Sequence, residues 1–304
     1  MAQVLARWAA GPDQALIERL GERATRRPLA LVSAVPTQTR AVSVTGSVCQ
    51  QRCAHCNGHY LQGMTALDAI CAAGLTDVRS LLISGGSRPT GEVPLADHLD
   101  RLLALPADLP LNLHVGLQDG SRLHPLRGRP VTVSFDLIGD DATAREIYGL
   151  DRPARDWFEA YERLQDAFPV IPHLTIGLRG GILSGERNVL DYLSRRPPPA
   201  LTFLVFRPTP GTALADRPVP DPAVVAELIA EAADRLPCPL HLGCMRPGGG
   251  WRQRADRLAW LAGARTIVMP DRTLVADLQA AGLPVTIGRE CCSLSVSAPE
   301  HPYE

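Results

Sequence analysis

Short runs of β-branched and other apolar residues alternate along the chain with stretches in which apolar residues recur at helical spacing. This alternation is typical of repeated βα units around a parallel sheet. Strands are predicted at residues 41–45, 80–84, 111–115, 131–137, 170–178, 201–207, 239–244 and 266–269. Helices are predicted at residues 66–73, 95–103, 154–167, 189–194, 223–235, 251–261 and 274–281.

Eight strands with helical returns favour a closed (β/α)8 barrel of the TIM type over an open doubly wound sheet, because no edge strands stand out. The barrel is expected at about residues 41–282, within one domain that covers 1–304. A helical extension at 13–27 precedes it, and a cysteine-containing tail at 283–304 is expected to fold over the barrel mouth. The connection between the third and fourth strands is short, so its helix is expected to be irregular.

The 31 basic and 32 acidic residues nearly cancel, which argues against nucleic acid as a partner. All 31 basic residues are arginine, so lysine-dependent aldolases, pyridoxal enzymes and P-loop NTPases are excluded. The chain lacks a signal-peptide pattern and a membrane-spanning apolar run, which predicts a cytoplasmic protein without a membrane partner. In that compartment, the eight cysteines are expected as metal ligands, catalytic groups or, for Cys71 and Cys238, small buried hydrophobes.

The sequence Cys49-Gln-Gln-Arg-Cys53-Ala-His-Cys56 follows the first predicted strand, at the end of the barrel where sites of this fold are built. Three thiolates can bind three irons of a 4Fe-4S cluster and leave the fourth iron open to a small chelating ligand. Zinc is the alternative, but a closed structural zinc site needs a fourth ligand at short spacing. His55 and His59 are the available candidates.

A C-x3-C-x2-C motif after a first barrel strand resembles the radical S-adenosylmethionine superfamily, from about residue 41 to the C-terminus. The resemblance implies that the open iron binds S-adenosylmethionine. One-electron reduction then releases a deoxyadenosyl radical, which abstracts hydrogen from a substrate. It further implies that Ser84, Gly85, Gly86 and Ser87 meet the methionine amino group, with Ser87 in place of the usual acidic residue. A plain turn at the strand end is the alternative.

Polar residues lie in or at the ends of four predicted strands: His114, Asp136, His173 and Arg207. Each alone is more often a satisfied core group than a catalytic one, since burying an unpaired polar group is costly. Four of them directed toward one barrel mouth predict a polar cavity, with the two histidines and the aspartate as catalytic candidates and Arg207 as a cofactor ligand. Glu186, at the start of a predicted helix, is a further candidate for the cofactor's ribose or methionine, although such glutamates commonly serve only the helix dipole.

Cys244 ends the seventh predicted strand, and Cys291 and Cys292 lie in a tail that can fold over the same face. Together they are candidates for a second iron–sulfur cluster, with Arg246 or His241 as a further ligand or electrostatic partner. Three thiols that bind no metal are the alternative, because adjacent cysteines bind one metal awkwardly. The residues leave both interpretations open.

The wider layout, including Ser-Val-Thr-Gly before Cys49 and Gly-Cys-Met-Arg-Pro around Cys244, resembles the biotin-synthase-like group and, more narrowly, the two-protein lipoyl synthases. This resemblance implies sulfur insertion into an octanoyl chain on a lipoyl carrier domain, with a sacrificed auxiliary cluster as the sulfur source. A related sister radical protein and a reducing ferredoxin or flavodoxin are the implied partners. Biotin synthesis, metallocofactor maturation and amino-acid rearrangement are the alternatives within the group. A non-catalytic iron–sulfur electron carrier is the alternative of another class.

Overall fold

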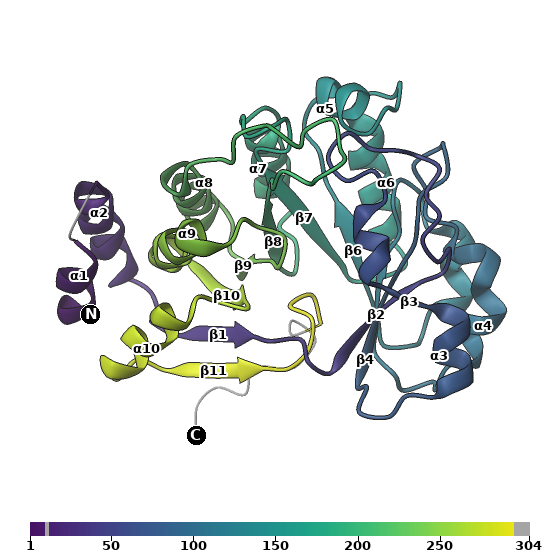
Figure 1. Cartoon of the computed structure of the whole chain (residues 1–304), viewed down its shortest axis with the longest axis horizontal. Helices are drawn as coiled ribbons and strands as arrows, with labels where there is room; N and C mark the ends of the chain where they lie inside the picture. Colours follow the sequence, from purple (N-terminus) through teal and green to yellow (C-terminus); the bar gives the residue numbers. More distant parts are fainter. Residues whose placement is uncertain (10–11, 295–304) are drawn as a thin grey trace.

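The computed structural model describes residues 1–9 and 12–294, and its centre is a curled parallel sheet with helices on its outer side (Figure 1). The sheet has eleven strands in the order β11-β1-β10-β9-β8-β7-β6-β5-β4-β2-β3. Their bounds are β1 Leu31–Ala34, β2 Thr39–Ser43, β3 Thr65–Ala66, β4 Ser80–Ser84, β5 Leu111–His114, β6 Val131–Asp136, β7 Val170–Ile176, β8 Leu201–Val205, β9 Leu240–Leu242, β10 Ala264–Val268 and β11 Val285–Gly288. The eight predicted strands correspond to β2 and to β4 through β10.

Helices follow most strands and return the chain across the outer side of the sheet. Their bounds are α1 Ala2–Trp8, α2 Gln14–Ala24, α3 Leu67–Ala73, α4 Leu99–Ala104, α5 Asp141–Glu146, α6 Arg155–Gln165, α7 Glu186–Arg195, α8 Pro222–Arg235, α9 Gly249–Ala262 and α10 Arg272–Ala280. Short 3-10 helices lie at η1 His59–Gly63, η2 Leu95–His98 and η3 Ser121–Leu126, and η3 takes the place of a helix in the short connection between β5 and β6. Within the described part of the chain, no helix is both long and apolar enough to cross a bilayer.

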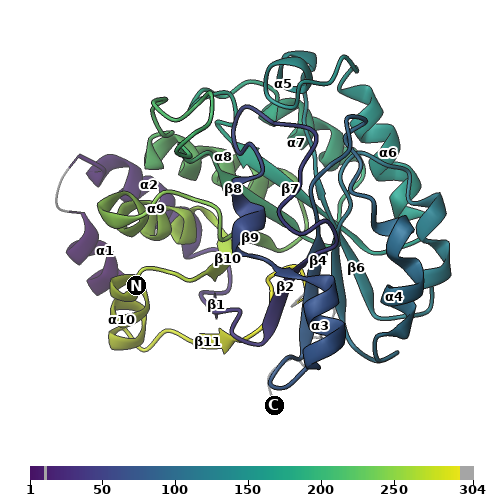
Figure 2. The same cartoon turned by 45° about the vertical axis from the view of Figure 1, so that its right-hand side comes forward.

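The sheet is open, which corrects the prediction of a closed eight-stranded barrel. Across the described residues, β11 forms one edge and β3 the other. The chain passes from β1 near one edge to β2 near the other through residues 35–38 alone, and Pro36 in this link has no N–H to continue a ladder. Backbone bonds from Val35 N to Gly288 O (2.7 Å) and from Gln38 N to Arg289 O (2.9 Å) tie the link to the residues at the end of β11. Figure 2 shows β1 beside β11, with β2 beyond the end of β1.

The two faces of the sheet differ sharply in character. Phe135 on β6 is buried and packs near Tyr161 of α6, with ring centroids 6.3 Å apart, so its face lies under the helices. Paired residues of adjacent parallel strands point to the same side, and neighbours along a strand point to opposite sides. A row of paired residues therefore shares the opposite, concave face: Asp136, His173, Thr202, His241 and Thr266. The concave face is polar where the outer face is apolar.

The C-terminal segment enters the concave side, so its described part lies within the curled sheet. This corrects the predicted tail over the mouth. Strand β11 accounts for residues 285–288, and the chain then turns inward. The backbone N–H of Cys291 donates to Thr39 Oγ1 (2.8 Å), and Cys292 is buried against Ala34 and Val268. Residues 295–304 lie outside the described residues.

The N-terminal extension contains the predicted helix, as α2, and a second helix, α1, that was not predicted. Trp8 at the end of α1 donates its indole N–H to Asp277 of α10 (2.7 Å), and its ring meets Trp260 of α9 edge-on at 6.0 Å. Arg257 lies over the same indole, 5.4 Å from the ring centroid. The extension therefore packs on α9 and α10, far from the cysteine motif along the sheet (Figure 1).

Candidate functional site

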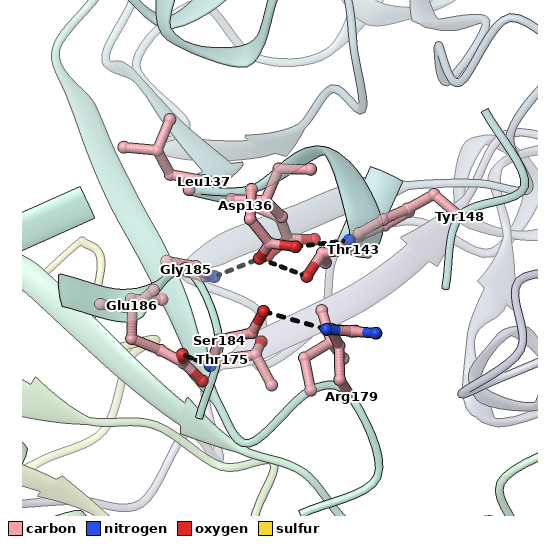
Figure 3. A pocket seen from close by; sticks show the side chains of 15 residues that line it. Asp136, Leu137, Thr143, Tyr148, Thr175, Arg179, Ser184, Gly185 and Glu186 are labelled. Carbon is pink, nitrogen blue, oxygen red and sulfur yellow. Dashed lines mark hydrogen bonds and ion pairs between the residues drawn. The ribbon is translucent and has the colours of Figure 1, made fainter. Parts of the chain in front are cut away.

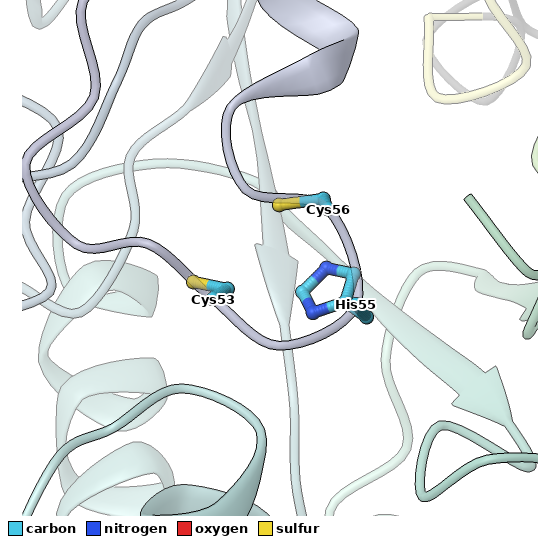
Figure 4. A group of neighbouring side chains, drawn as sticks. All are labelled: Cys53, His55 and Cys56. Atoms are coloured by element: carbon cyan, nitrogen blue, oxygen red, sulfur yellow. The ribbon is translucent and has the colours of Figure 1, made fainter. Parts of the chain in front are cut away.

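The cysteine motif lies in the loop that follows β2, at the C-terminal end of that strand. Ligand atoms of Cys53, His55 and Cys56 all lie within 4.8 Å of one another (Figure 4). Cys49 lies outside this compact group, with its Sγ 4.0 Å from the carbonyl oxygen of Ser87. The loop is anchored to the segment after α5, because Ala54 N donates to the carbonyl oxygen of Ile147 at 2.8 Å.

The thiols of Cys53 and Cys56 lie close enough to shift each other's pKa. The hydrogen bond from Cys53 lowers the pKa of Cys56 to about 4, with His55 contributing in the same direction, and the same contact raises the pKa of Cys53. Nδ1 of His55 is buried and has no hydrogen-bond partner among the described residues. Metal binding requires deprotonated thiols, and the lowered pKa of Cys56 favours that form. The sulfur donors fit an iron–sulfur cluster, and the added imidazole also allows zinc.

The end of β4 packs directly against this loop. Gly86 N donates to Thr45 Oγ1 (2.7 Å), and Gln50 N donates to the carbonyl oxygen of Ser87 (3.0 Å). A Cβ on Gly86 would lie 2.0 Å from the carbonyl oxygen of Val48, so only glycine allows this approach. The segment from Ser84 to Ser87 therefore shapes the cysteine loop. Its contact with a methionine amino group stays a prediction.

His114, Asp136 and His173 come together on the concave face, beside the cysteine loop. The imidazoles of His114 and His173 meet edge-on with ring centroids 5.0 Å apart, and His173 Nδ1 lies 3.8 Å from Asp136 Oδ1. Desolvation lowers the pKa of both histidines, so both rings are neutral. Desolvation also raises the pKa of Asp136, although its side chain is still 47% exposed. The trio can exchange hydrogen bonds with a ligand at neutral pH, and its catalytic role stays a prediction.

A pocket opens beside this trio, between the loops that follow β6 and β7 (Figure 3). It is small and partly open to solvent. Glu186 lines it, but its carboxylate accepts hydrogen bonds from Gly177 N (2.8 Å) and Ser184 N (2.6 Å). Through these two hydrogen bonds, Glu186 stabilises the glycine-rich loop after β7. Its contact with a cofactor stays a prediction, as does that of Arg207, which is exposed just after β8.

The other cysteines fall into two groups. Cys71 is exposed on α3, which corrects its expected burial, whereas Cys238 is half-buried against the core. Cys244 follows β9 as predicted and remains accessible to solvent. Although the residue is exposed, desolvation raises the pKa of its thiol, and the nearby charge of Cys291 acts in the same direction. The charge of Cys244 likewise acts on Cys292, so both tail thiols lie in its vicinity. Among the described residues, however, the compact group of three ligand atoms is the one at Cys53.

The two further ligand candidates near Cys244 have different surroundings. Arg246 is completely buried and binds both carboxylate oxygens of Asp256, at 2.9 and 3.0 Å. It also donates to the carbonyl oxygen of Gly243 (2.6 Å). Arg246 is therefore committed to holding the loop that carries Cys244. His241 lies on the concave face, and its Nδ1 has no hydrogen-bond partner within the described ranges.

A layer of polar residues that was not predicted lies beneath the trio. Asn112 donates from Nδ2 to Cys291 Sγ (3.4 Å), Ser134 donates to Asn112 Oδ1 (2.8 Å), and Ser293 lies within hydrogen-bond distance of Ser134. The alternation Leu-Asn-Leu-His in β5 could have identified Asn112, because it places the amide on the same face as His114. No local signal identifies Ser293, whose partners are far away in sequence.

Comparison with known proteins gives a fold but no family. No protein-family model and no curated protein sequence matches this chain. Among solved structures, the chain resembles methylornithine synthase (PylB), with a TM-score of 0.58 and 14% identity over 93% of either chain. It also resembles HydG, a maturase of the [FeFe]-hydrogenase, with a TM-score of 0.61 and 12% identity over 96% of this chain and 73% of that one. At these identities, what the chain shares with the two proteins is the α/β fold.

Proposed function

We propose that this protein is a radical S-adenosylmethionine enzyme in which Cys49, Cys53 and Cys56 hold a 4Fe-4S cluster. The observation that carries the proposal is the loop after β2, which gathers Cys53, His55 and Cys56 within 4.8 Å at the C-terminal edge of a parallel sheet. The two similar solved structures support it, because both are radical S-adenosylmethionine enzymes.

The protein's own groups would bind and shield the reactants. When bound, the cluster supplies the electron that cleaves S-adenosylmethionine to a deoxyadenosyl radical. Gly86 keeps the end of β4 against the cysteine loop, so the site is walled on that side. The neutral rings of His114 and His173, with Asp136, would hold polar groups of cofactor or substrate on the concave face.

For the substrate, we propose an octanoyl chain on a lipoyl carrier domain, into which the enzyme inserts sulfur. The position of Cys244 near the tail that carries Cys291 and Cys292 supports a role for these thiols in sulfur delivery. Holding an auxiliary cluster would require the three thiols to gather more tightly than they do here. A sister radical protein would be the partner, and a ferredoxin or flavodoxin the electron donor.

The second candidate is a reaction on a small molecule that uses only the first cluster. One of the two similar structures supports it, because that protein is a methylornithine synthase. An octanoylated carrier peptide and a panel of amino acids distinguish the two: thiolation of the peptide supports sulfur insertion, and consumption of an amino acid supports the alternative.

The decisive experiment is anaerobic reconstitution with iron and sulfide, followed by dithionite and S-adenosylmethionine. Deoxyadenosine should form, and Cys49→Ala, Cys53→Ala and Cys56→Ala should each abolish it. Cys71→Ala is the matched control, since this thiol is exposed on α3. A cluster that cycles between redox states without binding S-adenosylmethionine would instead indicate an electron carrier.

A further inference from the structure

The cysteine loop reaches from β2 to the segment that follows β8. On its way, Gln51 donates from Nε2 to the carbonyl oxygen of Tyr148, just after α5 (3.1 Å). Tyr60, in η1, then meets Thr209 in the loop after β8, and their hydroxyl oxygens lie 3.0 Å apart. In the sheet, β4, β5, β6 and β7 separate β2 from β8. One loop therefore spans the concave side at the C-terminal ends of the strands, and the contact between Tyr60 and Thr209 is its far attachment.

Thr209 is a firm anchor for this attachment. The residue is completely buried, and its hydroxyl donates to the carbonyl oxygen of Arg207 (3.3 Å). Its own carbonyl oxygen accepts a hydrogen bond from Thr212 Oγ1 (2.8 Å). A threonine hydroxyl has one hydrogen, so Tyr60 is the donor in its contact with Thr209. The loop after β8 thus holds Thr209 in place on its own, and Tyr60 binds to a fixed acceptor.

The turn after Cys56 connects η1 closely to the cysteines. Asn57 and Gly58 have φ angles of 44° and 74°, in the left-handed region, and they direct the chain into η1. A Cβ on Gly58 would lie 3.2 Å from Cβ of Cys49, so the turn lies beside that cysteine. The backbone N–H of His59, the first residue of η1, donates to the carbonyl oxygen of Cys56 (2.7 Å). A displacement of η1 would therefore disturb both cysteines.

We propose that Tyr60 and Thr209 are a positioning pair: their hydrogen bond holds the cysteine loop across the concave face and fastens it to the loop that carries Arg207. Among the described residues, this is the only side-chain hydrogen bond that η1 makes. The pair thereby keeps the cysteines in place and closes the two loops around whatever they bind. The inference rests on the proposed function only for the identity of the cluster and the cofactor.

The first test is hydrogen exchange of the full chain before iron is added, followed by NMR. It is read at the backbone N–H groups of His59 and Leu61, which are hydrogen bonded within the turn. Tyr60→Phe and Thr209→Val each remove one hydroxyl and nearly keep the shape of the side chain. Each should accelerate exchange about fivefold, the ratio that one net hydrogen bond gives. The double variant should be no faster than either, because both changes remove the same bond. Thr209→Ser, which keeps the hydroxyl, should exchange like the wild type.

The second test uses the reconstituted enzyme. With an iron chelator present, the visible absorbance of the cluster should decay about fivefold faster in Tyr60→Phe than in the wild type. The KM for S-adenosylmethionine should rise while kcat stays unchanged, because the bond holds the loops equally in the bound complex and in the transition state. Tyr192→Phe is the control and should change none of these values. It also removes a tyrosine hydroxyl, which donates to Glu162 of α6 (2.8 Å) on the outer side of the sheet.

Rapid exchange at His59 and Leu61 in the wild type would overturn the proposal, since the loop would then not be held. Single variants that exchange like the wild type would overturn it as well, and so would independent effects that multiply in the double variant. The wild-type spectrum decides even where a variant does not fold. Because exchange is measured without iron, failure of the wild type to form deoxyadenosine would reject the proposed function and leave this result standing.

Discussion

Gly86 lies so close to the cysteine loop that a methyl group on its Cα would fall 2.5 Å from Cα of Cys49. The nearest atoms to that methyl group belong to the backbone of Val48 and Cys49, so they cannot move aside as a flexible side chain would. We expect Gly86→Ala to displace the loop, to cost about 1–3 kcal/mol of stability or more, and to reduce iron bound per chain on reconstitution. Gly63→Ala is the control, because an added Cβ there would meet no described atom within 4 Å beyond its own chain neighbours. Equal iron content in the two variants would contradict the proposed fit.

The buried pair of Arg246 and Asp256 makes a prediction about stability. Arg246→Ala leaves a carboxylate without its partner inside the protein, so the free energy of unfolding should fall by about 3–5 kcal/mol. Arg19→Ala, which removes an exposed ion pair with Glu227, should cost at most about 1 kcal/mol. Urea unfolding monitored by circular dichroism measures both changes. Similar losses would show that the buried pair contributes no more than a surface pair.

His241 makes a prediction about acid stability. Burial lowers its pKa to about 4, below the roughly 6.5 of an unfolded histidine. Below pH ~6.5 the unfolded chain therefore binds a proton at His241 that the folded chain does not bind. The free energy of unfolding is unaffected by this group above pH ~6.5, and it decreases as the pH falls from there toward about 4. The expected slope is about 1.4 kcal/mol per pH unit. His241→Gln should reduce the slope by that amount, whereas His124→Gln, at an exposed position, should not.

The thiols near Cys244 allow radical generation to be separated from sulfur delivery. If Cys244, Cys291 and Cys292 serve only sulfur delivery, replacing any one by alanine should leave deoxyadenosine formation within about twofold of the wild type, a change below 1 kcal/mol in barrier. Thiolation of an octanoylated carrier peptide should disappear in each variant. Mass spectrometry of the peptide measures it. Continued thiolation would assign the sulfur to another donor.

Eight of the strands were predictable because their apolar runs are local signals. Strands β1 and β11, of four residues each, and the two-residue β3 were not predicted, so β2 was counted as the first strand. The break at Pro36 and the parallel pairing of β1 with β11 depend on partners far apart in the chain. A closed barrel was the simplest arrangement of eight strands, and the open sheet follows from contacts that no window of sequence contains.

The candidate site, like the fold, was predictable only in part. Cys49, Cys53 and Cys56 are recognisable from spacing alone, and His114, Asp136 and His173 from their places at strand ends. The position of the tail inside the sheet was not predictable, because residues 291–294 have no pattern that distinguishes the concave side from the mouth. Their contacts with β5, β6 and β7 exist only once the sheet has curled.

The pairing of β1 also constrains the order in which the chain can fold. Leu31 pairs with Val285, and Val32 pairs with Thr286 and Thr266. The partner residues of β1 in β10 and β11 therefore lie more than 230 residues further along the chain and are synthesised later. During synthesis, β1 has neither partner until the ribosome has passed β10, and its edges stay open to other strands for that time. Such long-range pairing makes assembly slow. Nascent chains halted before residue 264 should therefore keep residues 31–34 accessible to protease and chaperone, and this region should become protected only when β10 and β11 emerge.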